Sequence, residues 1–194
     1  MRRIATAKGR LSVFHSNTEL LIDYWRERKG TDRAPARASI NPADFASLLP
    51  QVFILGRLKP GRYGFRLVGG LVDDLHGGHL SIADPINLWT PAYRAPLQLA
   101  LEAVLRQPGP LVIAAEARVR GGQTLKLEIT LAPLAGPNGE IDRLIGLYQP
   151  ITPVAALVGQ AIETLAVRNI TAAGSAGAAF PRLKLAAMNG RQIA

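Results

Sequence analysis

The chain has 194 residues, 48% of them hydrophobic, which is enough for one substantial core, and its net charge at pH 7 is +9. It contains no cysteine, so disulfides, thiolate metal sites and cysteine nucleophiles are excluded. No apolar run approaches the roughly 18 residues of a membrane-spanning helix, and the basic N-terminus lacks the apolar stretch of a signal peptide. We therefore expect a protein of the cytoplasm.

The excess positive charge comes from the two ends of the chain. Residues 1–37 hold nine Lys/Arg and four Asp/Glu, and residues 168–194 hold four Lys/Arg and no acid, whereas residues 38–167 hold ten of each sign. Proteins that read a nucleic-acid groove usually carry their basic patch on the folded surface. Basic ends suit looser contact with nucleic acid or anionic lipid, and a role in solubility alone is the other interpretation.

The first predicted element is a helix over residues 16–29, preceded by a flexible basic segment at 1–15. Ser16 and Glu19 fit a capping box, in which the side chain of each residue bonds to the backbone of the other. Gly30 is the type of residue that commonly ends a helix.

The apolar residues of this helix form two adjacent pairs and so cover more than one narrow stripe. One member of each pair can pack on the domain while the other faces outward, and exposed aromatic surface usually marks an interface. The candidates for a homodimer contact are Leu20, Leu21, Tyr24 and Trp25. Packing of Tyr24 and Trp25 within their own chain is the alternative.

The middle of the chain reads as strands, helices and strands again. Two short strands are predicted at 53–56 and 63–68, and after a helical middle come three more strands separated by glycine-containing turns. The last of these, 141–148, is apolar on both faces except near its start, so we expect it in the middle of the sheet. A C-terminal helix is predicted over 153–167, followed by a disordered basic tail at 168–194.

Two strands, helices and three strands is the order of a PAS sensor domain, and the chain resembles that family from about residue 18 to residue 152. The likeness is closest to bacterial proteins in which one PAS domain makes up nearly the whole chain. The motifs that carry it are Leu21-Ile22-Asp23-Tyr24-Trp25-Arg26, Pro35-Ala36-Arg37, Leu48-Leu49-Pro50-Gln51-Val52-Phe53, Phe65-Arg66-Leu67-Val68-Gly69 and Leu144-Ile145-Gly146-Leu147 with Pro150.

This resemblance implies an α+β fold within residues 16–152. The expected fold is a PAS-like curved antiparallel sheet of five strands with helices on one face, a cavity between them, and an added N-terminal helix. PAS domains sense ligands or dock partners, and they often dimerise through a helix that precedes the first strand. A kinase, cyclase or DNA-binding module does not fit into this length, so the resemblance implies output through a separate effector protein.

One dense set of titratable side chains has the composition of a metal or acid–base site. Its members are Asp73, Asp74, His76, His79 and Asp84. Their spacing matches no established metal motif, and the sequence has no nucleophile elbow and no phosphate-binding glycine loop. We therefore expect no metal site, no catalytic residue and no enzymatic activity. The lack of cysteine also excludes flavin–cysteinyl photochemistry.

Ligand pockets are mostly apolar and contain a few polar anchors. Several aromatic and basic residues of the predicted domain fit that description, with a closed core filled by the aromatic rings as the alternative. The candidates for ligand contacts are Tyr63, Phe65, Arg66, His76, His79, Trp89 and Tyr148. The sequence points to no particular ligand or cofactor.

Taken together, these features predict a non-enzymatic cytoplasmic PAS regulatory protein that acts by homodimerisation and partner binding, with the sensing of a small ligand left open. The alternative is a protein that binds nucleic acid or a membrane surface through its basic ends. Such binding would weaken steeply as the salt concentration rises, because it releases condensed counterions.

Overall fold

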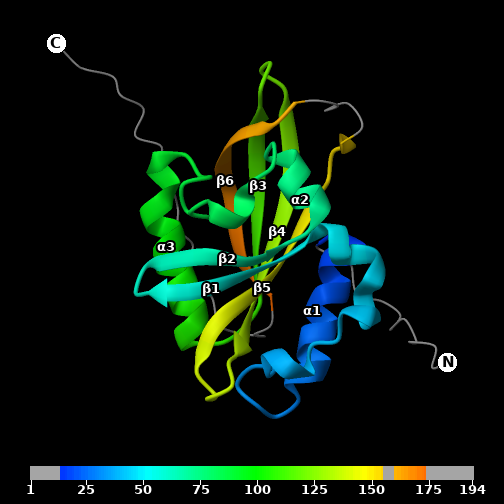
Figure 1. Cartoon of the computed structure of the whole chain (residues 1–194), viewed down its shortest axis with the longest axis vertical. Coiled ribbons are helices and arrows are strands. Elements are labelled where there is room, and N and C mark those ends of the chain that lie inside the picture. The colour runs from blue at the N-terminus through cyan, green and yellow to red at the C-terminus, as the bar shows by residue number, and fades with distance from the viewer. Residues whose placement is uncertain (1–13, 155–159, 174–194) are drawn as a thin grey trace.

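A computed structural model of the chain describes residues 14–154 and 160–173. Its centre is a six-stranded antiparallel sheet in the order β2-β1-β5-β4-β3-β6, with helices on both faces (Figure 1). The elements in chain order are α1 (Ser16–Lys29), the 3₁₀ helices η1 (Arg37–Ser39) and η2 (Pro42–Gln51), β1 (Val52–Lys59), β2 (Arg62–Val68), α2 (Gly70–Leu75), the 3₁₀ helix η3 (Leu80–Ile82), α3 (Pro91–Arg106), β3 (Leu111–Val119), β4 (Thr124–Ala135), β5 (Ile141–Pro150) and β6 (Ile162–Ala172). Within the two described ranges, no helix is long and apolar enough to span a membrane.

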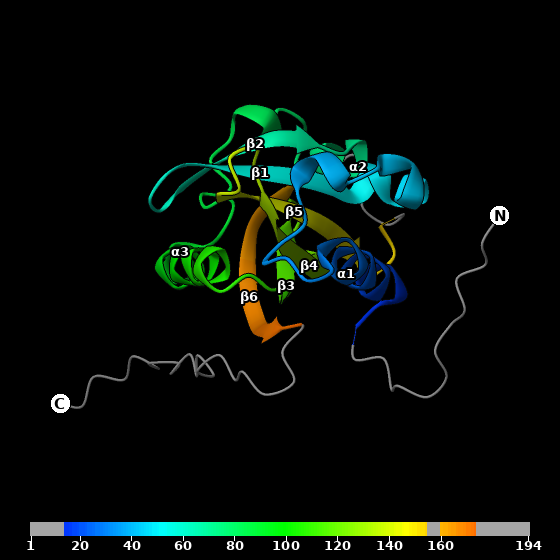
Figure 2. The same cartoon turned by 90° about the horizontal axis from the view of Figure 1, so that it is seen from below.

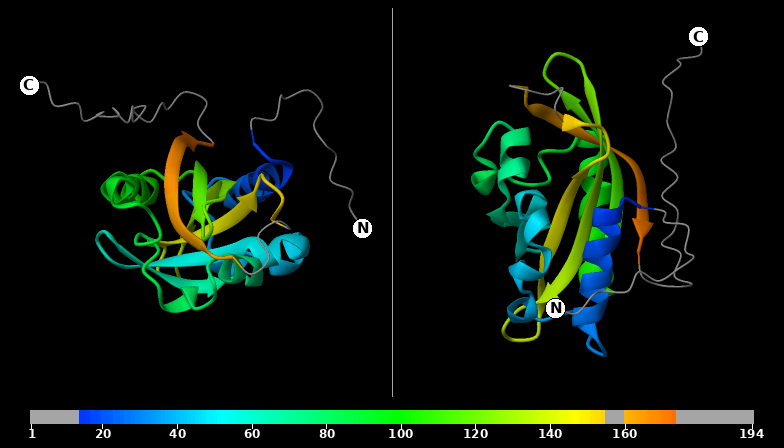
Figure 3. Two further views of the ribbon diagram at one scale, coloured as in Figure 1. Left: turned by 90° about the horizontal axis from the view of Figure 1, so that it is seen from above. Right: turned by 90° about the vertical axis from the view of Figure 1, so that its right-hand side faces the viewer.

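The middle of the sheet is buried on both faces, because its strands alternate between two apolar sets of side chains. Leu144 and Tyr148 of β5 belong to the larger core, which α3 covers, while Ile145 and Leu147 belong to a smaller core beneath α1. Figures 2 and 3 show α3 and α1 on opposite sides of β3 and β4. β5 lies between β1 and β4, so the predicted central position of the strand at 141–148 is confirmed.

The first helix starts where the sequence predicts, but its cap is different. His15 is the N-cap, and its Nδ1 atom accepts a hydrogen bond from the backbone N–H of Asn17 at 3.1 Å. Ser16 is the first helical residue, so the predicted capping box with Glu19 is wrong. Gly30 ends the helix with φ of 52°, a value that glycine adopts without the clash of a side chain.

Trp25 anchors α1 to its own sheet. Its side chain is 3% exposed, and the indole N–H donates a hydrogen bond to the carbonyl oxygen of Pro133 at 2.7 Å. Leu21, one turn earlier, is fully buried in the same cluster. A buried indole needs an acceptor for its N–H, and the carbonyl of Pro133 on β4 supplies it.

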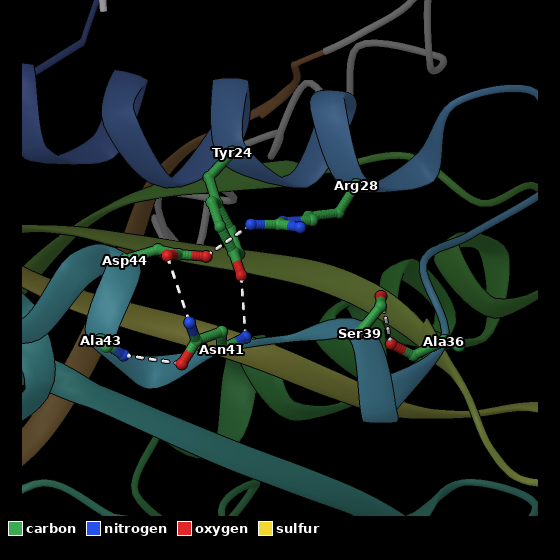
Figure 4. Close-up of polar contacts among 7 residues, drawn as sticks. All are labelled: Tyr24, Arg28, Ala36, Ser39, Asn41, Ala43 and Asp44. Atoms are coloured by element: carbon green, nitrogen blue, oxygen red, sulfur yellow. Dashed lines mark hydrogen bonds and ion pairs between the residues drawn. The ribbon is translucent and has the colours of Figure 1, made fainter. Parts of the chain in front are cut away.

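A polar clamp joins the C-terminal half of α1 to the segment that enters η2 (Figure 4). The Tyr24 hydroxyl accepts a hydrogen bond from the backbone N–H of Asn41 at 2.9 Å. The Arg28 guanidinium lies 5.1 Å from the centroid of the Tyr24 ring and pairs with Asp44 at 2.6 Å. Asn41 also accepts a hydrogen bond from the backbone N–H of Ala43, at 3.2 Å. The exposed ion pair contributes little by itself, but the set fixes where the segment after α1 lies.

The largest departure from the sequence prediction is at the C-terminal end, where residues 162–167 of the helix predicted over 153–167 belong to the strand β6. β6 pairs antiparallel with β3 along nearly its whole length, and its residues Ile162, Leu165 and Val167 join the main core. Five of the eleven residues of β6 are β-branched, which favours a strand over a helix. Pairing with the edge of β3 buries three apolar side chains, and this tertiary gain decides the conformation.

Because of β6, the sheet has six strands where five are predicted. Residues 168–172 therefore belong to the sheet rather than to the predicted tail. Residues 1–13, 155–159 and 174–194 lie outside the described residues, and with them lie most of the predicted N-terminal segment and tail.

Replacement of Trp25 by alanine is expected to lower the free energy of unfolding by about 3–5 kcal/mol, because it opens a cavity beneath α1 and removes a buried hydrogen bond. Urea denaturation at neutral pH measures this change. Leu20→Ala, on the exposed side of the same helix, is the matched control and should change the stability by less than about 0.5 kcal/mol. Equal stabilities of the two variants would contradict the anchoring role of Trp25.

Candidate functional site

A cavity of about 50 Å³ lies between the sheet and the helices of the larger core. Its wall comes from strands of the sheet, from α2, η3 and α3, and from the segment that leads into α3. The lining residues are Phe53, Leu55, Phe65, Val72, His76, Leu80, Pro85, Ile86, Leu88, Trp89, Leu97, Leu101, Ile113, Ile129, Leu131, Tyr148 and Leu165. Nearly all of them are aliphatic or aromatic, as in most small-molecule pockets.

One side of the cavity is shaped by the packing of Phe53 over Gly146. The two residues are cross-strand partners on β1 and β5, and a Cβ atom at position 146 would overlap the phenyl ring. The Phe53 ring makes edge-to-face contacts with Phe65 and Tyr148, with centroids 6.0 and 6.4 Å apart. The glycine therefore lets three aromatic rings assemble along one wall.

Two of the lining residues, His76 and Tyr148, form a hydrogen-bonded pair. His76 Nε2 and the Tyr148 hydroxyl oxygen are 2.9 Å apart, and the two rings also stack edge to face. Burial lowers the pKa of His76 to about 4, against a smaller opposing effect of Asp73, and burial raises the pKa of Tyr148. Both groups are therefore neutral at neutral pH, and the pair can donate and accept hydrogen bonds without charge.

The turn that carries His76 is closed by Asp73. The Oδ1 atom of Asp73 accepts a hydrogen bond from the backbone N–H of Leu80 at 2.8 Å, across the glycine pair. The rest of the titratable set does not converge: Asp74 and His79 are exposed, and Asp84 accepts a hydrogen bond from the backbone of its own loop. In the described part of the chain, no group of three or more such side chains is placed to hold a metal ion.

The structure brings four of the seven predicted ligand residues to the cavity. Phe65, His76, Trp89 and Tyr148 line it. The remaining three do not. His79 is exposed at a turn, where its φ is 67°, and Arg66 is exposed and folds back over Gly56 on the sheet face away from the cavity.

Tyr63, the third of these residues, is buried but has a structural partner. Its hydroxyl donates a hydrogen bond to Glu102 Oε1 on α3 at 2.7 Å, and Glu102 Oε2 accepts another from Arg57 at 2.8 Å. Burial raises the pKa of Tyr63, and the hydrogen bond to Glu102 adds to the effect. This network joins the β1–β2 hairpin to α3 and does not reach the cavity lining.

In each adjacent pair of the candidate dimer residues, one member is buried and the other is more exposed. Both aromatic members, however, make their contacts within the chain. Leu21 and Trp25 are buried against the sheet, and Tyr24 belongs to the clamp of Figure 4. Leu20 is 46% exposed and is the member of the set whose side chain is most open to a partner. A homodimer contact through Trp25 would require α1 to leave its own sheet.

The sequence prediction named aromatic and basic residues as ligand contacts, whereas most residues of the cavity wall are aliphatic. Ile129 and Leu131 have the alternation of buried strand positions, and Leu97 and Leu101 lie on the apolar face of α3. Such a pattern predicts burial, but it does not distinguish a side chain that fills the core from one that borders a void.

The lowered pKa of His76 predicts a loss of stability in acid. The unfolded chain, with a pKa near 6.5, takes up the proton before the folded chain, with a pKa of about 4. Falling pH between these values therefore favours unfolding, by up to about 3 kcal/mol in total. Urea denaturation of the wild type and of His76→Gln from pH 7 to pH 4 should show a steeper loss for the wild type.

His79→Asn is the control for this measurement, because position 79 is exposed and asparagine accepts its left-handed backbone. It should keep the full acid sensitivity of the wild type. A pH dependence that His76→Gln leaves unchanged would show that His76 is not a source of the effect.

Comparison with known families finds a match to the PAS domain over residues 13–149. No curated protein matches the chain. Among solved structures, an LOV protein from Rhodobacter sphaeroides is 10% identical and has a TM-score of 0.44; the match covers 60% of this chain and 72% of that chain. The LOV domain of the photoreceptor Aureochrome1 is 13% identical, with a TM-score of 0.44 and coverage of 59% and 84%.

VqmA from Vibrio cholerae is 16% identical with a TM-score of 0.44; the match covers 58% of this chain and only 52% of that protein. These similarities are too weak to transfer a ligand or a partner. The family match is different in kind, since it extends from the start of α1 to the end of β5 and covers well over half of the sequence. The chain therefore belongs to the PAS domain family.

Proposed function

We propose that the chain is a regulatory sensor whose input is the binding of a small molecule in the cavity between the sheet and α3. Membership of the PAS family supports a sensory or regulatory role in general. The observation that carries the specific proposal is an apolar cavity whose lining residues include one hydrogen-bonded polar pair. Apolar enclosure with few polar anchors is the usual character of small-molecule sites.

The energetic cost of the cavity supports the same proposal. An empty space of about 50 Å³ in an otherwise packed core costs on the order of 1 kcal/mol, because the atoms around it lose contacts. Larger side chains at a few lining positions would remove that cost. A binding role gives a reason for keeping the space open.

A sensory role is favoured over catalysis by the chemistry of the wall. The lining residues of the described chain include no carboxylate, amine or aliphatic hydroxyl, and the two ionisable side chains, His76 and Tyr148, are bonded to each other. General acid–base catalysis works best when the pKa of the group lies near the working pH, and the pKa of His76, about 4, lies well below neutrality.

The output would pass through the outer wall of the cavity to other proteins of the cytoplasm. Trp89 and Leu165 both line the cavity, and the backbone of Leu165 exchanges hydrogen bonds of 2.9 Å with Leu88 and Thr90. A molecule that displaces either side chain would strain this bridge between β6 and the start of α3. We infer that a second copy of the chain or a separate effector protein reads the change, with Leu20 as a candidate contact.

Binding of nucleic acid or anionic lipid through the basic ends stays a prediction. Residues 1–13 and 174–194 lie outside the described residues, so the structure adds no support to it. Loss of salt-dependent binding on removal of both segments would be its specific sign.

A cavity-filling variant tests the proposed function. The protein is incubated with a metabolite extract and dialysed, and the retained small molecules are released by denaturation and identified by mass spectrometry. Leu101→Phe places a larger side chain at the cavity wall, whereas Leu99→Phe adds the same ring on the exposed side of α3, where residue 99 is 69% exposed. We expect a compound that the wild type and Leu99→Phe retain and Leu101→Phe loses.

Circular dichroism checks that each variant is folded, and Val72→Leu serves as a second cavity-filling variant. Retention of the same compounds by all four proteins, or of none by any of them, would overturn the proposal.

A further inference from the structure

The wall of the cavity carries polar atoms but no charge. Three lining side chains have a polar atom: His76, Trp89 and Tyr148. Asp73 is the acid that acts on the pKa of His76, but it is not among the lining residues. Its carboxylate accepts a hydrogen bond from the backbone N–H of Leu80. An ionic molecule that entered would lose its hydration and meet no opposite charge, and this costs several kcal/mol.

The His76–Tyr148 pair can bind a ligand that donates a hydrogen bond or one that accepts a hydrogen bond. If His76 Nε2 is unprotonated, it accepts the Tyr148 proton, and the phenolic oxygen can accept a hydrogen bond from a ligand. If Nε2 carries the proton, it donates to the phenolic oxygen, and the Tyr148 O–H is free to donate to a ligand. Either tautomer is available, because among the described residues the other ring nitrogen of His76 has no hydrogen-bond partner.

The volume limits what the cavity can take. About 50 Å³ corresponds to roughly four water-sized probe volumes. A molecule with a handful of non-hydrogen atoms fits this space, and most of its surface would contact the aliphatic and aromatic wall. A single polar group placed next to Tyr148 would meet a hydrogen-bonding partner.

We propose that the cavity selects a compact, uncharged and mainly apolar molecule whose single polar group, a hydroxyl, carbonyl or amide, hydrogen-bonds to the Tyr148 hydroxyl. This inference rests on the proposed function and adds the chemical class of the ligand. Selectivity comes from the neutral wall, which disfavours ions of both signs, and from the His76–Tyr148 pair, which can hydrogen-bond to one polar group of the ligand.

Two matched pairs of small probes test this class. Isobutyramide and isobutyrate have nearly the same shape but differ in charge, as do isobutanol and isobutylammonium. Each is titrated into the full-length protein at neutral pH, and the NMR signals of the methyl groups of Ile113, Ile129 and Leu131 report binding inside the cavity. We expect the neutral member of each pair to bind at least roughly tenfold more tightly than its ionic partner, because only the ion loses hydration without compensation.

Tyr148→Phe keeps the aromatic ring and removes the hydroxyl. It should weaken isobutanol binding by roughly fivefold, the value expected for the loss of one hydrogen bond. Leu101→Phe should abolish the binding of all probes, which shows that the signals arise in the cavity. Thermal unfolding of each variant confirms that it is folded at the temperature of the titration.

The outcomes separate the two proposals. Equal binding of ions and neutral probes, or unchanged isobutanol affinity in Tyr148→Phe, would overturn the ligand class, while loss of binding in Leu101→Phe would still support the cavity as a site. No binding by any probe to the wild type would overturn the ligand class, and it would count against the proposed function as well.

Discussion

The packing of Phe53 over Gly146 is the contact on which the candidate site depends. Because residue 146 has no side chain, the phenyl ring on β1 can lie over the central strand β5 and contact Tyr148 of that strand, while it also contacts Phe65 of β2. Tyr148 in turn holds His76 at hydrogen-bonding distance. A chain of contacts therefore runs from one glycine in the centre of the sheet to the His76–Tyr148 pair in the cavity wall.

The opposite face of the sheet makes this arrangement rigid. The same strands that line the cavity are covered on their other side by α1, through Trp25 and the clamp that includes Tyr24. A sheet buried on both faces cannot shift one strand without disturbing two cores. In the outer wall of the cavity, the segment that leads into α3 meets the edge strand β6 through the backbone hydrogen bonds of Leu165 to Leu88 and Thr90.

Features of this architecture are predictable from the sequence when they depend on residues close together in the chain. The helix at 16–29 and the alternating strands are encoded locally, by a glycine stop and by apolar periodicity. β6 is encoded locally only in part, by its β-branched residues, because its pairing is with β3, a partner about fifty residues away in sequence. Arg66 was expected at the ligand, yet it follows Phe65 on β2, and strand alternation therefore turns its side chain to the face away from the cavity. The role of Gly146 is also not visible in the sequence, because it depends on Phe53, its partner on the neighbouring strand β1.

A crystal structure of the protein under xenon pressure tests the central claim, that the core holds an open apolar cavity, most directly. Xenon binds in empty apolar cavities and needs no polar partner. We expect an internal xenon atom in contact with Phe53, Trp89 and Leu165, with the His76–Tyr148 hydrogen bond intact. A core in which neighbouring side chains fill this space and no xenon is bound would contradict it.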